Sequence, residues 1–307
     1  MLARDGIDQQ FLEAQTDRLP HRHLAVQSRG GTMTFRAFLS LVCAIGLAAC
    51  ASPIESSQPI SSTFGAAARA SLPRSVRLLN WNVHKGTLTR FGSEFARLTR
   101  NADVIVLQEM STHSAGRGPQ GAVTAIGGHG YVMAHAIRYR DSFAGCASGA
   151  AANVVRSKVL LTSNSERIVG TPKSSVVTVY RIAGSRDKLL VANTHGMNLA
   201  GKFTFDLEPF RRQLAAVGEE IARHRGPVVW AGDFNTHDRE KTDLLLAETA
   251  RLGLTHVHVA ESHHLMKSRK GFVLDHVFTR SLRDVRARAM PGNGSDHTSI
   301  ELTFRVP

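Results

Sequence analysis

Cysteine is scarce in this chain of 307 residues, which holds only Cys43, Cys50 and Cys146. If the N-terminal region up to residue 49 is removed on export and Cys50 is modified, Cys146 is the only thiol left. That excludes an intramolecular disulfide and a zinc site built on cysteine. Cys146 stands in the small-residue stretch FAGCASGAAAN with no catalytic motif around it, so we do not expect it to act as a nucleophile.

Aromatic and acidic residues are also few. Aromatic side chains make up 6% of the chain, which argues against a platform on which single-stranded bases stack. The 25 Asp and Glu residues face 38 Lys and Arg residues, a formal net charge of +13. The basic residues are scattered rather than gathered in a tail. Their surplus favours an anionic partner, such as nucleic acid, anionic lipid or a phosphorylated small molecule, without choosing among them.

The apolar run from Ala37 to Ala49 is shorter than the about 20 residues that a membrane span needs. It follows a single basic residue, Arg36, and ends in Leu-Ala-Ala-Cys at Cys50, as a signal peptide with a lipobox does. We therefore expect residues 33–49 to be a lipoprotein signal peptide and Cys50 to carry the lipid. A buried helix of a globular domain is the alternative interpretation. Ala51 after the cysteine is compatible with sorting to the outer membrane, with the protein facing the periplasm.

Composition also sets the expected domain boundaries. Residues 1–32 carry four acids and four arginines, unlike the start of a signal peptide, so translation is expected to begin at Met33 and residues 1–32 to be a non-native upstream extension. Residues 50–74 are rich in Ser, Ala and Pro and are predicted to be a flexible tether that follows the lipidated cysteine. Residues 75–307 are predicted to be one domain, because they contain no internal repeat and no second linker.

Hydrophobic periodicity within this domain predicts a mixture of strands and helices. An apolar stripe at spacings of three and four predicts a helix from about Asp206, and two more helices are expected near 92–100 and 240–252. Gly-rich residues 114–130 are expected to form a long loop. The predicted strands are 76–83, 104–107, 131–137, 175–182, 188–194, 227–231, 272–278 and 299–305.

Polar residues stand at the ends of many of these strands. In VVWAGDFN an apolar run reaches Gly232 and is followed by Asp233 and Asn235, which point to the same side of an extended chain. Taken singly, such residues are usually turn residues. The full set of polar positions, in chain order, is Asn82, Glu109, His195 with Asn193 on the same face, Asp233 with Asn235, Asp275 inside an otherwise apolar predicted strand, and Asp296 with His297.

This set resembles the endonuclease/exonuclease/phosphatase superfamily of DNase I-like phosphoesterases. The superfamily carries an Asn on the first strand, a Gln-Glu pair, a Thr-His, a Gly-Asp-x-Asn, a strand Asp and a terminal Ser-Asp-His. The chain matches each of them, with Asn82, Gln108-Glu109, Thr194-His195, Gly232-Asp233-Phe234-Asn235, Asp275 and Ser295-Asp296-His297. The stretches WNVHKG, KSSVVTVY and NTHGMN are most similar to the bacterial YafD-like and YbhP-like members. The resemblance implies an α/β (α+β) fold, a four-layer sandwich of two packed mixed β-sheets flanked by helices, with the active site at one end.

The residue types also agree with metal-dependent phosphoester chemistry. Glu109, Asn82 and Asp296 offer only oxygen ligands, which suit Mg²⁺, or Mn²⁺ as a substitute, and not zinc. His297 is the expected base that takes a proton from water, and Asp275 the carboxylate that orients it.

The remaining expected roles are held by five further groups. Asp233 would orient the water, Asn235 would donate to a phosphate oxygen and His195 would stabilise developing negative charge. Lys173 and Asn198 are candidate substrate-binding residues, with a surface lysine and a turn asparagine as equal alternatives.

The resulting expectation is a Mg²⁺-dependent phosphodiesterase anchored in the cell envelope. Its substrate would be nucleic acid or a phospholipid or sphingomyelin-type headgroup, and no protein partner is predicted. Phosphomonoester hydrolysis is an alternative activity. A non-catalytic envelope binding lipoprotein on the same fold is the alternative of another class.

Overall fold

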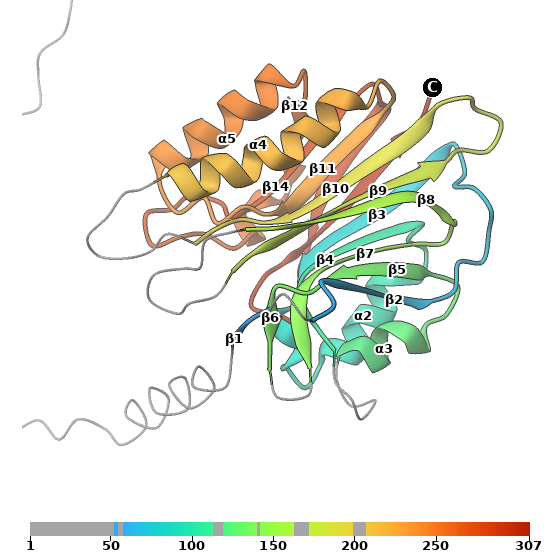
Figure 1. Ribbon diagram of the computed structural model, residues 1–307, viewed down its shortest axis with the longest axis horizontal. Coiled ribbons are helices and arrows are strands. Elements are labelled where there is room, and N and C mark those ends of the chain that lie inside the picture. The colour runs from blue at the N-terminus through green and yellow to red at the C-terminus, as the bar shows by residue number, and fades with distance from the viewer. Residues whose placement is uncertain (1–51, 55–57, 113–118, 140–141, 163–171, 199–206) are drawn as a thin grey trace, which may run out of the picture. The chain divides into compact units, whose positions relative to one another are not determined.

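A computed structural model of the protein describes residues 52–54, 58–112, 119–139, 142–162, 172–198 and 207–307 (Figure 1). The predicted upstream extension, the signal peptide and Cys50 lie outside the described residues. The described part contains two mixed β-sheets that pack face to face, with helices on their outer faces, as expected for a four-layer sandwich. None of the helices in the described ranges is long and apolar enough to cross a membrane.

The first sheet has ten strands in the order β1-β6-β7-β4-β3-β16-β15-β13, with β5 pairing with β7 and β2 with β5. Its parallel pairs are β3–β4 and β13–β15. The strands are β1 (Ser52–Pro53), β2 (Ser61–Gly65), β3 (Ser75–Asn82), β4 (Val104–Ser111), β5 (Gly130–Ala134), β6 (Ile137–Arg138), β7 (Phe143–Ala150), β13 (Val259–Ala260), β15 (Arg283–Met290) and β16 (Ser299–Arg305).

The second sheet has six strands in the order β12-β14-β11-β10-β9-β8, with one parallel pair, β10–β11. Its strands are β8 (Val154–Leu161), β9 (Ser174–Arg181), β10 (Lys188–His195), β11 (Val228–Asp233), β12 (Thr255–His256) and β14 (Asp275–Arg280). The helices are α2 (Phe91–Thr99), α3 (Pro119–Ala125), α4 (Glu208–Arg223), α5 (Arg239–Arg251) and the short 3₁₀ turns η1 (His84–Gly86) and η2 (Ser262–His264).

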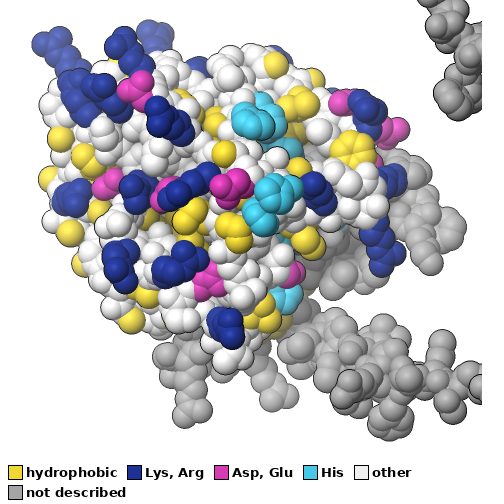
Figure 2. All heavy atoms as spheres, turned by 180° about the vertical axis from the view of Figure 1, so that it is seen from behind, with side chains coloured by type: hydrophobic (Ala, Val, Ile, Leu, Met, Phe, Trp, Pro, Cys, Tyr) yellow, Lys and Arg dark blue, Asp and Glu magenta, His cyan; other side chains and the backbone are white. Residues whose placement is uncertain are grey.

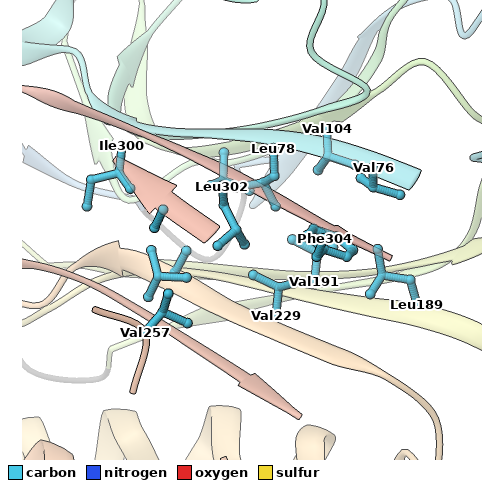
Figure 3. Packing of buried hydrophobic residues seen from close by; sticks show 14 of the residues in the cluster. Val76, Leu78, Val104, Leu189, Val191, Val229, Val257, Ile300, Leu302 and Phe304 are labelled. Carbon is cyan, nitrogen blue, oxygen red and sulfur yellow. The ribbon is translucent and has the colours of Figure 1, made fainter. Parts of the chain in front are cut away.

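The central strands are apolar on both faces because both faces are covered. In β3 the alternate residues Val76 and Leu78 pack between the sheets, whereas Leu79 and Trp81 pack under α2 and α3. In strands β10 and β11, alternate side chains likewise pack either in the inter-sheet core or against α4 and α5. Figure 3 shows side chains from both sheets meeting in the inter-sheet layer. Continuous apolar runs such as VVWA are therefore central strands of a covered sheet.

Two expectations about irregular segments were wrong. Part of the predicted tether, residues 58–74, belongs to the fold. β2 pairs antiparallel with β5, Phe64 stacks on Tyr131 with ring centroids 4.9 Å apart, and Leu72 is fully buried. The serine-rich composition did not indicate this strand, because the aromatic ring that it packs against belongs to a residue far along the chain. The expected loop at 114–130 likewise contains α3.

Other elements were missed or misplaced. The sequence did not indicate β7, β8 and β15, because FAGCASGA is built of small residues and VVRSKVLL and RDVRARAM carry charges on an exposed face. The strand expected at 272–278 begins only at Asp275, so this carboxylate stands at a strand end rather than inside a strand.

Candidate active site

The polar residues singled out in the sequence converge at one end of the sandwich, where strand ends of both sheets meet. The parallel register of β10 and β11 pairs His195 with Asp233, and the antiparallel register of β14 pairs Asp233 with Asp275. In the other sheet, Asn82 at the end of β3 pairs with Gln108 of β4. Parallel neighbours end on the same edge and the antiparallel strand β14 starts there, which brings the groups together.

Backbone irregularities direct two of these side chains. The register of β4 against β7 shifts between Leu107 and Met110, and Glu109 adopts a left-handed backbone with φ of 51°. The bulge turns Glu109 toward the strand ends, whereas Gln108 stays inside and donates to Asn80 Oδ1 and Asn193 Oδ1 at 3.0 and 2.7 Å. Gln108 therefore ties the two sheets together instead of reaching a substrate.

A glycine permits the close approach of β10 and β11. A Cβ on Gly232 would lie 1.9 Å from the carbonyl oxygen of Thr194. Thr194 in turn accepts a hydrogen bond from the Trp230 indole at 2.9 Å. The Gly-Asp-x-Asn motif thus begins with glycine because the neighbouring strand leaves no space for a side chain.

Asp233 is the group on which the site converges. Its Oδ2 accepts a hydrogen bond from Asn82 Nδ2, and its Oδ1 accepts one from the backbone N–H of Asn235, both at 2.9 Å. The Nε2 atoms of His195 and His297 lie 3.7 and 3.8 Å from Oδ2. Burial opposes the charged form, but the charges of His297 and His195 and these hydrogen bonds lower the pKa of Asp233, so it is a carboxylate.

His297 and Asp275 form a buried pair. His297 Nδ1 donates to Asp275 Oδ2 at 2.8 Å, and the Trp81 indole donates to the backbone oxygen of His297 at 2.9 Å, which fixes the loop before β16. Burial alone would lower the pKa of His297, but Asp275 and Asp233 raise it well above its usual range. Burial also raises the pKa of Asp275. The pair shares a proton, which His297 holds at Nδ1, facing Asp275.

The expected metal ligands Glu109, Asn82 and Asp296 all contact one turn of the chain, η1. Lys85 Nζ donates to Glu109 Oε2 at 3.1 Å, and the backbone N–H of His84 donates to Asn82 Oδ1 at 3.0 Å. His84 Nδ1 lies 3.3 Å from Asp296 Oδ2. Burial opposes the charge on Glu109, yet the neighbouring His195, Lys85 and Lys173 side chains lower the pKa of Glu109, so it is a carboxylate.

These donors fit a hard divalent cation. Two carboxylates and one amide oxygen, completed by water and phosphate, form the type of set that Mg²⁺ takes. The described part of the chain contains no cluster of three or more Asp, Glu, His or Cys side chains arranged to hold a metal.

Direct contacts tie Lys173 and Asn235 to this site, and Asn198 follows β10 in the chain. Lys173 Nζ lies 3.3 Å from His195 Nε2, so Lys173 belongs to the site and is not merely a surface lysine. Asn235 Nδ2 donates to the carbonyl oxygen of Gly196 at 2.9 Å, which engages one of its two amide hydrogens. Asn198 is half-buried at the described end of the segment after β10. Cys146 is fully buried in β7 and burial raises its pKa to about 12, which excludes it as a nucleophile.

Sequence reasoning missed three basic residues. His84 and Lys85 follow Asn82 in the stretch WNVHKG. This stretch supported the resemblance to the family, but neither residue was assigned a role from the sequence. Lys241 of α5 is almost fully buried, donates to the carbonyl oxygens of Met197 and Asn235, the latter at 2.7 Å, and lies 4.5 Å from the Phe210 ring centroid. In the sequence, Lys241 is an ordinary polar residue of a surface helix. Nothing in the local pattern indicated that its ammonium group supports the loop after β11.

Comparison with known proteins identifies the family of the chain. The model of the Endonuclease/Exonuclease/phosphatase family matches residues 79–297. The chain belongs to this family. Among its relatives is a UPF0294 protein of Yersinia enterocolitica, 31% identical over 231 residues that cover 75% of this chain and 84% of the relative.

Solved structures of the family share the fold. A family member from Beutenbergia cavernae superposes with a TM-score of 0.60 at 19% identity, over 76% of this chain and 72% of that one. ANGEL2, a 2′,3′-cyclic phosphatase, superposes with a TM-score of 0.57 at 14% identity, over 82% of this chain and 99% of that one. The matched region of the family model begins inside β3 and ends at His297, so it spans the whole set of converging polar residues.

Proposed function

We propose that the protein is a Mg²⁺-dependent phosphodiesterase of the cell envelope. The observation that carries this proposal is the buried His297–Asp275 pair, whose free imidazole nitrogen lies 3.8 Å from the Asp233 carboxylate. That separation lets one water, placed to the side of the two atoms, donate a hydrogen bond to each of them. A purely structural network has no need for a second imidazole, His195, on the same carboxylate oxygen at 3.7 Å.

Each side chain of the site has a different role in hydrolysis. Neutral His297 takes the proton of the attacking water at Nε2, and Asp275 stabilises the imidazolium that forms. Asp233 accepts a hydrogen bond from the same water and aims it at phosphorus. His195 and Lys173 stabilise the negative charge that develops on the phosphate oxygens. Glu109, Asn82 and Asp296 would hold a divalent cation, which would supply further stabilisation of the negative charge that develops during hydrolysis.

A substrate screen tests the activity and its class. The purified protein with Mg²⁺ should hydrolyse bis-p-nitrophenyl phosphate faster than p-nitrophenyl phosphate, because the diester is the proposed substrate. Plasmid DNA, RNA and sphingomyelin, assayed in parallel, identify the natural class. His297→Ala should lose the activity, and His129→Ala, which removes a histidine whose ring bonds to Gly127 O and Ala102 O and lies beside Tyr131, should keep it. Preference for the monoester would favour a phosphomonoesterase, and no hydrolysis of any substrate would favour a binding protein.

The surface charge does not choose between nucleic acid and lipid. On the face drawn in Figure 2, Lys and Arg side chains are spread among acidic and apolar ones rather than gathered in a single basic patch. The proposed attachment to the envelope therefore rests on residues 33–50 and not on the domain surface.

Attachment through lipid on Cys50 has its own test. We expect the mature protein to begin at Cys50 and to fractionate with outer membranes, because Leu-Ala-Ala-Cys ends the apolar run. Cys50→Ala should block processing or release the protein from membrane fractions, whereas Cys146→Ala should leave its fractionation unchanged. Mass spectrometry that finds an unacylated chain starting at Met1 would contradict this part of the proposal.

A further inference from the structure

The turn η1 has an unusual backbone for its sequence. Three successive residues have left-handed φ values, 45° at His84, 58° at Lys85 and 62° at Gly86. Glycine adopts this region readily, but residues with a Cβ do so at an energetic cost. Hydrogen bonds hold the turn: Asn82 Oδ1 accepts from the backbone N–H of His84, and Val83 O accepts from the backbone N–H of Gly86. The strained turn needs an explanation beyond chain reversal.

Its side chains provide one, because both face the oxygens assigned to the metal. The Lys85 ammonium lies 3.1 Å from Glu109 Oε2, and Asp296 adds to the negative potential around it. The His84 imidazole lies 3.3 Å from Asp296 Oδ2. The basic groups of η1 thus occupy the electrostatic position of a cation between Glu109 and Asp296.

From this geometry we infer that Lys85 is a resident counter-ion of the metal site, which holds Glu109 in place and is displaced when a divalent cation binds. The inference rests on the proposed function, because it takes Glu109 as a metal ligand. An ammonium and a divalent cation on the same carboxylate repel each other strongly, so the two compete. Displacement is sterically open: the Lys85 side chain is 37% exposed, and its flexible stem can carry the ammonium into solvent.

The alternative role of Lys85 is an ordinary structural ion pair that fixes Glu109 for the metal. The two roles make opposite predictions. Removing a competitor tightens metal binding, whereas removing a structural support weakens it.

Metal binding by the purified full-length protein separates the two roles. Mn²⁺ affinity, measured by calorimetry, should be about 5- to 150-fold higher in Lys85→Met than in the unmodified protein, the usual range of coupling between two ligands. Lys85→Arg keeps the charge and should bind Mn²⁺ like the unmodified protein. Lys188→Met removes an equal charge from the exposed first residue of β10 and should also change nothing. Mn²⁺ should raise the Tm of Lys85→Met more than that of the unmodified protein.

The outcomes distinguish this inference from the proposed function. Glu109→Gln should lose Mn²⁺ binding, which establishes the ligand. If Glu109→Gln loses binding but Lys85→Met binds Mn²⁺ equally or more weakly, Lys85 is a structural partner, the inference is overturned and the metal site stands. If neither the unmodified protein nor Lys85→Met binds Mn²⁺, both proposals fail together.

Discussion

Asp275→Asn should lower kcat by about 10²- to 10⁴-fold, the range that general-base assistance spans, with KM little changed. The amide keeps the volume of the side chain but removes the charge that stabilises protonated His297, 2.8 Å away. Asp275 is nearly fully buried and contacts His297 rather than the open side of the site. Its contribution therefore appears when charge develops in the transition state and not when substrate binds.

A double-mutant cycle on kcat tests whether the two residues act together. Asp275→Asn combined with His297→Ala should cost hardly more than His297→Ala alone, because the carboxylate acts through the imidazole. Asp284→Asn is the matched control, since it makes the same change at a surface carboxylate paired with Arg305. Simply additive losses would show that Asp275 only supports the strand end.

The pH profile gives an independent readout of the same pair. Asp275 and Asp233 raise the pKa of His297, and only neutral His297 can accept a proton. Activity should therefore rise with pH, and the rise should lie above the usual range of histidine. Asp275→Asn removes the largest charge that raises the pKa, so the rise should move to lower pH. A profile that keeps its position in Asp275→Asn would contradict this assignment.

Removal of the divalent cation should have the largest effect of all. Hydrolysis should fall to background in EDTA and return with Mg²⁺ or Mn²⁺, because the metal contributes several kcal/mol of charge stabilisation, or about 10³-fold and more in rate. Glu109→Gln should cause a loss of the same size with saturating Mg²⁺. Glu240→Gln, an exposed acid in the first turn of α5, is the matched control.

Two measurements serve as controls for this prediction. Far-UV circular dichroism should be the same with and without EDTA, because the metal ligands extend from strands whose cores are already packed. Full activity in EDTA would overturn the role of Glu109 as a metal ligand and would leave its contacts with Lys85 and His195 as purely structural ones.

The motifs were enough to predict the family, the set of polar strand ends and, through the family resemblance, the sandwich of two sheets. These could be read locally, because motifs such as Gly232–Asn235 join an apolar strand to a functional turn within a few residues. The expected helices near 92–100 and 240–252 were also visible, since an amphipathic stripe or a cap is a local feature. The position of Asp233 beside His195 follows once the strands pair in parallel.

Features that depend on distant partners could be recognised only in the folded protein. β2 is a strand because β5 offers it an edge and Tyr131 a ring to stack on, and β7 is a central strand although its residues are small, because neighbouring strands bury it. A composition of serine, glycine and alanine carries no record of such partners.

Dependence on distant partners also explains why some residues of the site could be predicted from the sequence and others could not. His297, Asp275 and Asp233 could be named from motifs, whereas Lys85 could not, since its role depends on the left-handed backbone of η1 and on a bulge in β4 that turns Glu109 toward it. The left-handed backbone of η1 and the bulge in β4 are properties of the folded molecule. No local pattern in the sequence encodes the 3.1 Å contact between Lys85 and Glu109 that they produce.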